Sequence, residues 1–301
     1  MWAIVTMLLW GPLPVEEPPR PVPNVVQIKV HLIHLFNISE KDQTFEALFY
    51  MWTSWPATDE PPRIELVNAV DFKVHLTEIS RQNGRHIKIQ KVLGTFFIDF
   101  DLKNFPLDRQ RLFIEFEDFA RDARSLVLTG DGDQPTVNGD MGLADWRLTH
   151  QAYRQEENLV GGDPERCFSR LVCVLDLERR VSFYATRFFL PLLLLVCCSF
   201  TALFLDLECV ETMVQIGITG MLSIIALALS MNDYLPRVSY VVLIDRIFII
   251  CYCIVFGVVA LAVRCRHLVH QGAADKAVVL RNRVRLVFIP MMVLSLFASM
   301  W

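Results

Sequence analysis

The chain has 301 residues, 53% of them hydrophobic, with a mean hydropathy of +0.37 and a net charge of −4. Soluble domains are usually about 45–50% apolar, so this composition excludes an ordinary soluble protein. The weak negative charge also argues against a nucleic-acid partner. Most of the apolar excess follows Ser182, and the sequence therefore predicts a soluble domain followed by a membrane domain.

The chain begins with an apolar segment, Met1 to Pro12, which carries no basic residue. A proline-rich segment follows and ends at Pro23. Residues 1–23 are interpreted either as the remnant of an export signal or as an N-terminal tail. In both cases we expect the folded part to begin near residue 24.

Residues 24–182 contain short runs that alternate apolar and polar residues, as half-buried β-strands do. Turn-forming pairs such as Asn83-Gly84 and Asn138-Gly139 separate several of these runs. The expected strands span residues 25–36, 44–55, 64–70, 72–78, 86–92, 95–102, 110–116, 126–128, 146–153 and 168–181. Many short strands between turns predict an extracellular antiparallel β-sandwich.

The cysteines indicate neither a disulfide framework nor a metal site. Only Cys167 and Cys173 lie in the soluble half. On one strand they would be about 20 Å apart, beyond the reach of a disulfide. The chain has no CxxC or HxxxH pair, so we expect no metal and no cofactor.

Four apolar segments follow the predicted sandwich, at about residues 183–205, 212–233, 239–263 and 284–301. A helix needs roughly 20 apolar residues to cross the bilayer core. Residues 183–301 are therefore predicted to form a transmembrane domain of four helices. The basic residues between the third and fourth segments are Arg264, Arg266, Lys276, Arg281, Arg283 and Arg285. The positive-inside rule places them in the cytoplasm, and the sandwich and the C-terminus outside.

The second apolar segment carries a polar stripe on one helical face, because its residues recur at spacings of three and four. The stripe consists of Glu211, Gln215, Thr219, Leu222, Ala226, Leu229 and Asp233. Several copies around an axis would line a pore with this stripe. Carboxylate rings concentrate cations and an apolar ring can close a pore, so Glu211, helped by Glu208, is predicted to select ions and Leu222 and Leu229 to form the gate.

Two further observations bear on this pore. The loop from Asp206 to Glu211 contains three acids and no base, although it should face the cytoplasm, and a cation pathway would explain this. Alternatively, Gln215 and Thr219 form hydrogen bonds across a helix bundle in which glycines allow close packing.

Three short motifs of the chain resemble those of a known family. Phe105–Gln110 reads Phe-Pro-Leu-Asp-Arg-Gln and resembles the FPxDxQ signature of Cys-loop pentameric ligand-gated ion channels. Pro191 in the first apolar segment and the Leu-Pro-Arg sequence at residues 235–237 fit the same family. The two flanking cysteines of animal members are Ile98 and Leu112 here, which resembles bacterial members. The order of Gln, Thr, Leu and Ala in the stripe is similar to the amine-gated, cation-selective bacterial kind.

The resemblance implies a homopentamer in the inner membrane, surrounded by membrane lipids, which conducts monovalent cations when a small-molecule agonist, a small primary amine, binds between subunits. It assigns the ligand site to Tyr50, Glu65, Glu117, Phe119, Tyr153 and Phe168. It assigns coupling between the sandwich and the pore to Phe105, Pro106, Asp108, Arg180 and Pro236, with Asp108 paired to Arg180. An ammonium group needs both a counter-charge and aromatic faces, and this set supplies both.

One departure from the family concerns the segment between Trp55 and Pro62, which is shorter than in its members. A strand or loop of the sandwich is therefore expected to be missing or rebuilt near the ligand site.

Two other classes of protein are alternatives to a channel. A membrane-anchored β-sandwich sensor or adhesion module would need no polar stripe. An enzyme would need a catalytic motif, and the chain contains no GxSxG, HExxH or glycine-rich phosphate loop.

Overall fold

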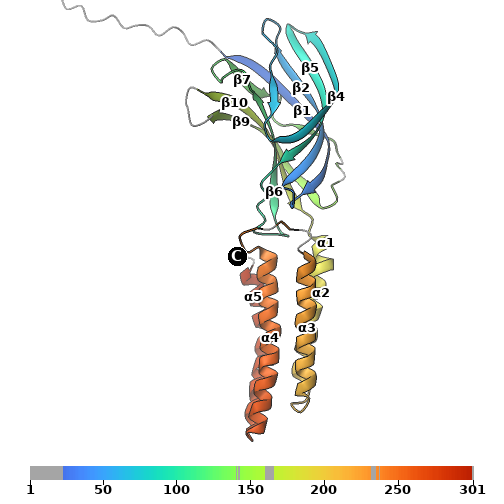
Figure 1. The fold of residues 1–301 in the computed structure, drawn as a ribbon, viewed down its shortest axis with the longest axis vertical. Coiled ribbons are helices and arrows are strands. Elements are labelled where there is room, and N and C mark those ends of the chain that lie inside the picture. Colours follow the sequence, from blue (N-terminus) through green and yellow to red (C-terminus); the bar gives the residue numbers. More distant parts are fainter. Residues whose placement is uncertain are drawn as a thin grey trace, which may run out of the picture.

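The computed structural model describes residues 23–139, 141, 143–159, 166–231, 235, 236 and 238–299, with side chains up to residue 287. The chain forms a β-sandwich above a bundle of long helices, and the two parts meet end to end (Figure 1). The N-terminal tail or signal remnant, the Gly161-Gly162 turn and Asp233 lie outside the described residues.

One sheet of the sandwich has the strand order β4-β5-β2-β1-β7, and the short β8 also pairs with β1. These strands are β1 (Asn24–Ser39), β2 (Thr44–Pro56), β4 (Ala69–Gln82), β5 (Arg85–Phe97), β7 (Leu126–Gly130) and β8 (Thr136–Val137). β1, β2, β5 and β4 pair antiparallel, whereas β7 and β8 run parallel to β1. The sheet is therefore mixed at the edge formed by β7 and β8.

The second sheet has the order β3-β6-β10-β9, and all its pairs are antiparallel. Its strands are β3 (Ile64–Leu66), β6 (Arg109–Asp118), β9 (Trp146–Leu159) and β10 (Cys167–Arg179). Residues of β2 alternate between buried and half-buried, and those of β6 alternate in the same way for most of their length. This alternation turns one face of each strand into the shared core, which includes Phe45, Phe49 and Phe116.

The edge strand β4 is unusual because every residue after Ala69 is exposed. Its exposed apolar side chains are those of Val70, Phe72, Val74, Leu76 and Ile79. Within the described part of the chain, no strand pairs with its outer edge. The chain passes from β2 to the three-residue β3 through residues 57–63.

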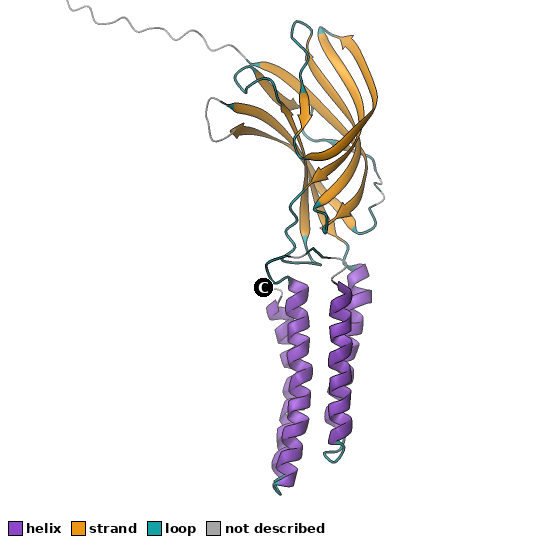
Figure 2. Ribbon diagram, viewed as in Figure 1, coloured by secondary structure: helices purple, strands orange, loops and turns teal. Residues whose placement is uncertain are grey.

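Helices follow the sandwich and are drawn in purple in Figure 2. The first runs over Ser182–Phe204 and comprises α1 (Ser182–Tyr184), η2 (Ala185–Phe189), α2 (Leu190–Thr201) and η3 (Ala202–Phe204). The others are α3 (Val210–Met231), α4 (Leu243–His270) and α5 (Ala274–Ser299). Among the described residues, the first segment, α3 and α4 are long and apolar enough to span a membrane. The predicted fold class, a β-sandwich followed by membrane helices, is confirmed.

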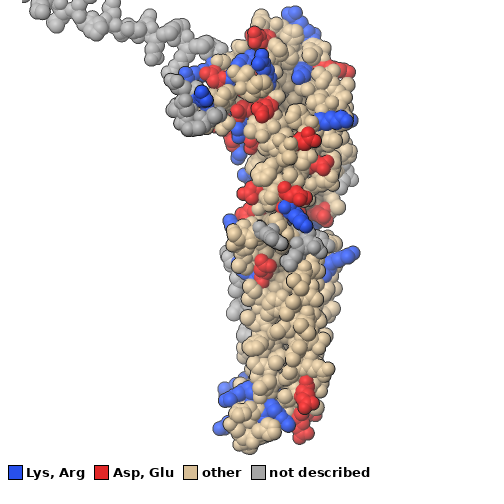
Figure 3. Space-filling view, in the orientation of Figure 1, with Lys and Arg blue, Asp and Glu red and all other residues tan. Residues whose placement is uncertain are grey.

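The helix boundaries differ from the expected ones in the last helix. The apolar pattern placed it at 284–301, but α5 already begins at Ala274. The additional turns carry Lys276, Arg281 and Arg283, while Arg264 and Arg266 lie at the end of α4. Only the three residues from Gln271 to Ala273 separate α4 from α5. In the space-filling view, charged side chains gather at the far end of the helices and the stretch above them is almost bare of charge (Figure 3).

Candidate functional site

The polar stripe of α3 lies on a face that the rest of the chain leaves open. Leu222 is 62% exposed and Leu229 is 61% exposed. The described members of the stripe are all exposed: Glu211, Gln215, Thr219, Leu222, Ala226 and Leu229. The structure thus keeps the predicted pore residues on one accessible face, and the seventh, Asp233, lies outside the described residues.

The glycines of α3 lie on its buried face. Gly217 and Gly220 are buried, together with Met213 and Ile224. A Cβ atom at Gly217 would clash with Val259 of α4, and one at Gly220 would come within 2.5 Å of Ser199 Oγ in α2. Close packing through glycine therefore uses the buried face of α3, and among the described residues no hydrogen-bond partner is recorded for the side chains of Gln215 and Thr219.

The inner end of α3 is acidic. Asp206, Glu208 and Glu211 are all exposed where the chain turns from the first helix into α3. The turn is held by the Cys209 N–H, which donates to the Asp206 carbonyl at 2.9 Å, and by the Met213 N–H, which donates to the Cys209 carbonyl at 3.1 Å. Three carboxylates thus surround the start of the predicted pore helix.

The junction between the sandwich and the helices contains a buried ion pair between Asp108 and Arg179. The prediction paired Asp108 with the neighbouring Arg180 and was wrong. Asp108 does not pair with Arg180, which is exposed. Arg179 instead donates from Nε to Asp108 Oδ1 at 2.7 Å and from Nη2 to Glu40 Oε1 at 2.6 Å. The side chains of Arg179 and Asp108 are 2% and 1% exposed. Burial alone would lower the pKa of Arg179, but its hydrogen bonds and the charges of Asp108 and Glu40 raise it.

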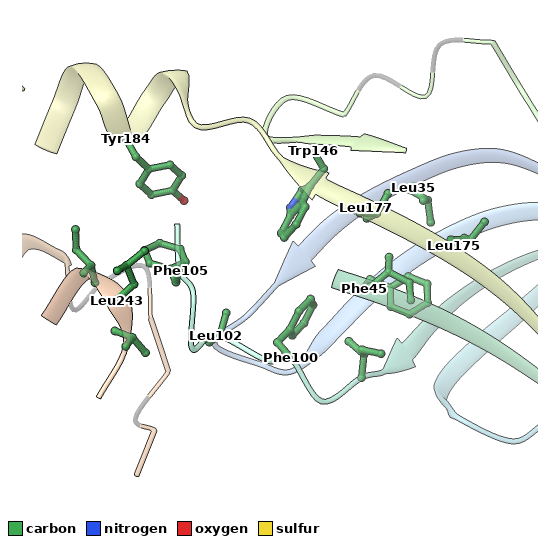
Figure 4. Close-up of a cluster of buried hydrophobic side chains, with 14 of the residues drawn as sticks. Leu35, Phe45, Phe100, Leu102, Phe105, Trp146, Leu175, Leu177, Tyr184 and Leu243 are labelled. Carbon is green, nitrogen blue, oxygen red and sulfur yellow. The ribbon is translucent and has the colours of Figure 1, made fainter. Parts of the chain in front are cut away.

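Aromatic rings surround the same guanidinium. Its carbon lies 4.0 Å from the ring centre of Trp146 and 4.8 Å from that of Phe105. Phe105 in turn packs edge-to-face on Tyr184 of the first helix, with 5.1 Å between ring centres. Figure 4 shows Phe105, Trp146 and Tyr184 in one buried cluster with Leu243 of α4. The cluster therefore joins the sandwich to the first helix and to α4 through packed side chains.

The rest of the signature loop also contacts the helices. Gln110 Nε2 donates to Asp108 Oδ2 at 2.6 Å, and Pro106 is buried behind a cis peptide bond to Phe105. Leu107 lines an apolar cavity together with side chains of α2 and α4. The Leu243 N–H donates to the Lys103 carbonyl at 2.9 Å, which ties the start of α4 to the same loop.

The remaining coupling candidate, Pro236, lies in the link between α3 and α4. It is half-buried, and the adjacent Leu235 packs against the core. Tyr240 in the same link accepts a hydrogen bond through its hydroxyl from the Leu102 N–H at 3.2 Å. The link therefore contacts the sandwich through Tyr240, although no direct contact of Pro236 with the signature loop is recorded among the described residues.

Four of the predicted ligand residues gather at one end of the β3-β6-β10-β9 sheet. Glu65 lies opposite Glu117, and Glu117 lies opposite Arg170. Phe168 is two residues from Arg170 on β10, and Phe119, which is exposed, follows β6. Glu117 is already paired, because its Oε2 accepts from Arg170 Nε at 3.0 Å and from Asn158 Nδ2 at 3.1 Å.

Tyr153 does not lie with this group, because it pairs with Cys173 further along the sheet. Its hydroxyl accepts a hydrogen bond from the Val30 N–H at 2.7 Å, and its ring packs against the sandwich core. Burial raises its pKa well above the ordinary value. The side chain therefore joins the two sheets of one sandwich.

Tyr50 lies on β2, in the other sheet. Its ring is 5.7 Å from the ring of Trp52, and Lys91 Nζ lies 5.7 Å from its centre. Lys91, Arg170 and Arg179 were not among the predicted site residues. Strand alternation from Leu175 and Leu177 turns Arg179 inward and was the signal that could have identified it.

Comparisons with known proteins agree with this architecture. The chain is 29% identical over 178 residues to the gamma-aminobutyric acid receptor subunit beta of Lymnaea stagnalis, an alignment that covers 58% of this chain and 35% of that protein. It is 25% identical over 182 residues to pH-sensitive chloride channel 2 of Drosophila melanogaster, covering 58% and 35%. Its homologues are receptor and channel subunits.

A human relative, the gamma-aminobutyric acid receptor subunit rho-2, is 24% identical over 174 residues, covering 58% of this chain and 37% of that protein. No protein-family model matches the chain. The chain spans about a third of the length of these relatives. Channel relatives are consistent with the expectation that the protein is not an enzyme, and they agree with the resemblance to the Cys-loop superfamily.

Proposed function

We propose that this protein is a subunit of a homopentameric ligand-gated channel that conducts monovalent cations. The observation that carries the proposal is the open face of α3, which runs from Glu211 to Leu229 on an otherwise apolar helix. A lipid-facing helix gains nothing from exposed glutamine and carboxylate groups, because these groups lose hydration in hydrocarbon. Around a common axis, the same face meets water.

Charge supports cations as the permeating ions. Asp206, Glu208 and Glu211 are exposed at the inner end of α3, and the loop that holds them contains no basic residue. Five copies would surround the inner mouth with carboxylates, which attract cations and repel anions. One relative is named as a chloride channel. A bilayer experiment that identifies the permeating ion therefore decides between cation and anion conduction.

A small primary amine is the proposed agonist. Arg170 pairs with Glu115 and Glu117 at 2.9 and 3.0 Å, and Glu65 lies opposite Glu117 on the neighbouring strand. This group of four side chains thus contains three carboxylates and one guanidinium. The exposed ring of Phe119 and the half-buried ring of Phe168 supply aromatic faces for an ammonium group.

The names of the relatives support an amine ligand, and the distribution of basic residues supports the orientation in the membrane. Gamma-aminobutyric acid, named in several relatives, itself carries a primary amine. The basic residues at the inner ends of α4 and α5 support a location of the sandwich outside the cell or in the periplasm. We place the channel in the inner membrane of a bacterium, with lipids around α2, α4 and α5.

The direct test is a current recording from purified protein in planar bilayers under a potassium chloride gradient. The channel proposal predicts currents that a short primary amine evokes and that reverse near the potassium equilibrium potential. Reversal near the chloride potential would overturn cation conduction. A monomeric protein without current would favour the alternative, a membrane-anchored sensor or adhesion module.

The gate can be tested at Leu222. Leu222→Ser should hydrate the apolar constriction that five such side chains form, because a hydroxyl group opposes dewetting. We expect a higher open probability, or activation at lower agonist concentration, in single-channel recordings. Ile218→Ser, also on an exposed part of α3 but outside the stripe, is the matched control. Equal effects of the two substitutions would place the gate elsewhere.

The ligand site can be tested at Glu65. Glu65→Gln removes the carboxylate of this cluster that has no ion pair among the described residues. We expect the amine concentration for half-maximal current to rise about tenfold, while conductance and selectivity stay unchanged. Glu178→Gln alters an acid at the opposite end of the same sheet and serves as control. Unchanged potency in Glu65→Gln would exclude this cluster as the amine site.

A further inference from the structure

Two arginines of the last helix contact the end of the first. Arg281 Nη1 donates to the Leu205 carbonyl at 2.9 Å, and Arg285 Nε donates to the Leu203 carbonyl at 3.0 Å. Arg285 Nη2 contacts the same Leu203 carbonyl. Because the two arginines are four residues apart on α5, they lie on one face, one turn apart.

These carbonyls need outside partners. The first membrane helix ends in the 3₁₀ turn η3, and Leu205 leaves it in an extended conformation. The last carbonyls of a helix have no partner within the helix, and cations are favourable there because the helix dipole is negative. The Arg285 guanidinium also lies 4.5 Å from the ring centre of Phe204. The arginines thus satisfy a helix end that would otherwise depend on water.

The same helix end is the start of the connection to α3. Leu203 is fully buried, and the six residues after Leu205 reach Glu211. Short hydrogen-bonded turns fill this connection, so it transmits a shift of Leu205 to the first turn of α3. The position of Glu211 therefore depends on where α5 holds the end of the first helix.

We infer that Arg281 and Arg285 are positioning residues which act as a latch, through which the last helix holds the inner mouth of the pore in place. The inference rests on the proposed channel function, because it assigns the mouth to Glu211 and its neighbours. The latch needs no contact between α5 and the permeating ion. It makes the last helix, on the outside of the bundle, a determinant of selectivity.

Hydrogen exchange tests the latch without any current. We would compare the unmodified protein in nanodiscs with the double variant Arg281→Gln, Arg285→Gln, and follow the peptide spanning residues 203–213 by mass spectrometry. Its amides should exchange about tenfold faster in the variant, which corresponds to about 1.4 kcal/mol of local stability. Arg283→Gln, an exposed arginine between the two, is the matched control and should leave exchange unchanged.

A double lysine variant refines the test, because lysine keeps the positive charge and N–H donors and should restore most of the protection. Equal exchange in all four proteins would overturn the latch. In bilayers, the glutamine pair should move the reversal potential toward zero and Arg283→Gln should not. Faster exchange with an unchanged reversal potential would overturn the effect on the mouth. A silent unmodified protein would count against the channel itself, while exchange would still decide whether the latch exists.

Discussion

Replacing Arg179 by glutamine should destabilise the junction between sandwich and helices by about 3–5 kcal/mol, because it leaves the Asp108 carboxylate buried without its partner. Gln110 donates one hydrogen bond to Asp108, which is too little to offset a lost guanidinium. The guanidinium also contacts Trp146 and Phe105, so the aromatic cluster loses its centre as well. We expect a clearly lower thermal unfolding midpoint in detergent and loss of agonist-evoked current.

The neighbouring arginine provides the control. Arg180 carries the same charge one position later but is exposed, so Arg180→Gln should change stability by less than about 0.5 kcal/mol. Combining Arg179→Gln with Asp108→Asn removes both charges and should recover part of the lost stability. If Arg179→Gln and Arg180→Gln unfold at the same temperature, the buried pair does not hold the junction together.

Replacing Glu211 by glutamine should abolish most of the preference for cations. At about 8 Å from the axis and an effective dielectric constant of about 20, each carboxylate attracts a monovalent cation by about 2 kcal/mol. Five such groups at a narrow mouth dominate the energy of entry. The reversal potential in a potassium chloride gradient should therefore move from near the potassium value toward zero.

Asp275→Asn is the matched control for this charge. Asp275 lies in the first turn of α5, on the same side of the membrane as Glu211, but not on the pore helix. Its removal changes the local charge equally and should leave the reversal potential unchanged. An equal shift in both variants would mean that general surface charge, and not a ring at Glu211, selects the ions. A shift in neither would assign selection to another ring.

Much of the fold could be predicted because alternation along the strands and long apolar runs are local signals. Prediction failed where packing decides. The pattern split β5 near Gly94, whereas the strand runs through and Gly94 pairs with Ala47 of β2. A glycine is needed there because a Cβ atom would meet the ring of Phe96. The polar start of α5 was interpreted as a loop because the hydropathy criterion detects only the apolar part of a helix.

The candidate site shows the same division between local and long-range information. The stripe on α3 follows from helical spacing alone, and the structure leaves its described members exposed. The partner of Glu117 could not be deduced, because Arg170 meets it only through the register of β6 and β10. Strand alternation along β10 was sufficient to show that Arg179, and not Arg180, points inward. The prediction relied on the family motif and therefore selected Arg180.

The edge strand β4 has a practical consequence for work with the isolated sandwich. Among the described residues no strand pairs with its outer edge, and its side chains Val70, Phe72 and Ile79 are exposed. Such an edge is a template for pairing with a second chain, and charged residues such as Lys73 and Arg81 only weaken the attraction. A soluble fragment cut before Ser182 should therefore aggregate as its concentration rises, and polar substitutions along β4 are the first choice for producing it.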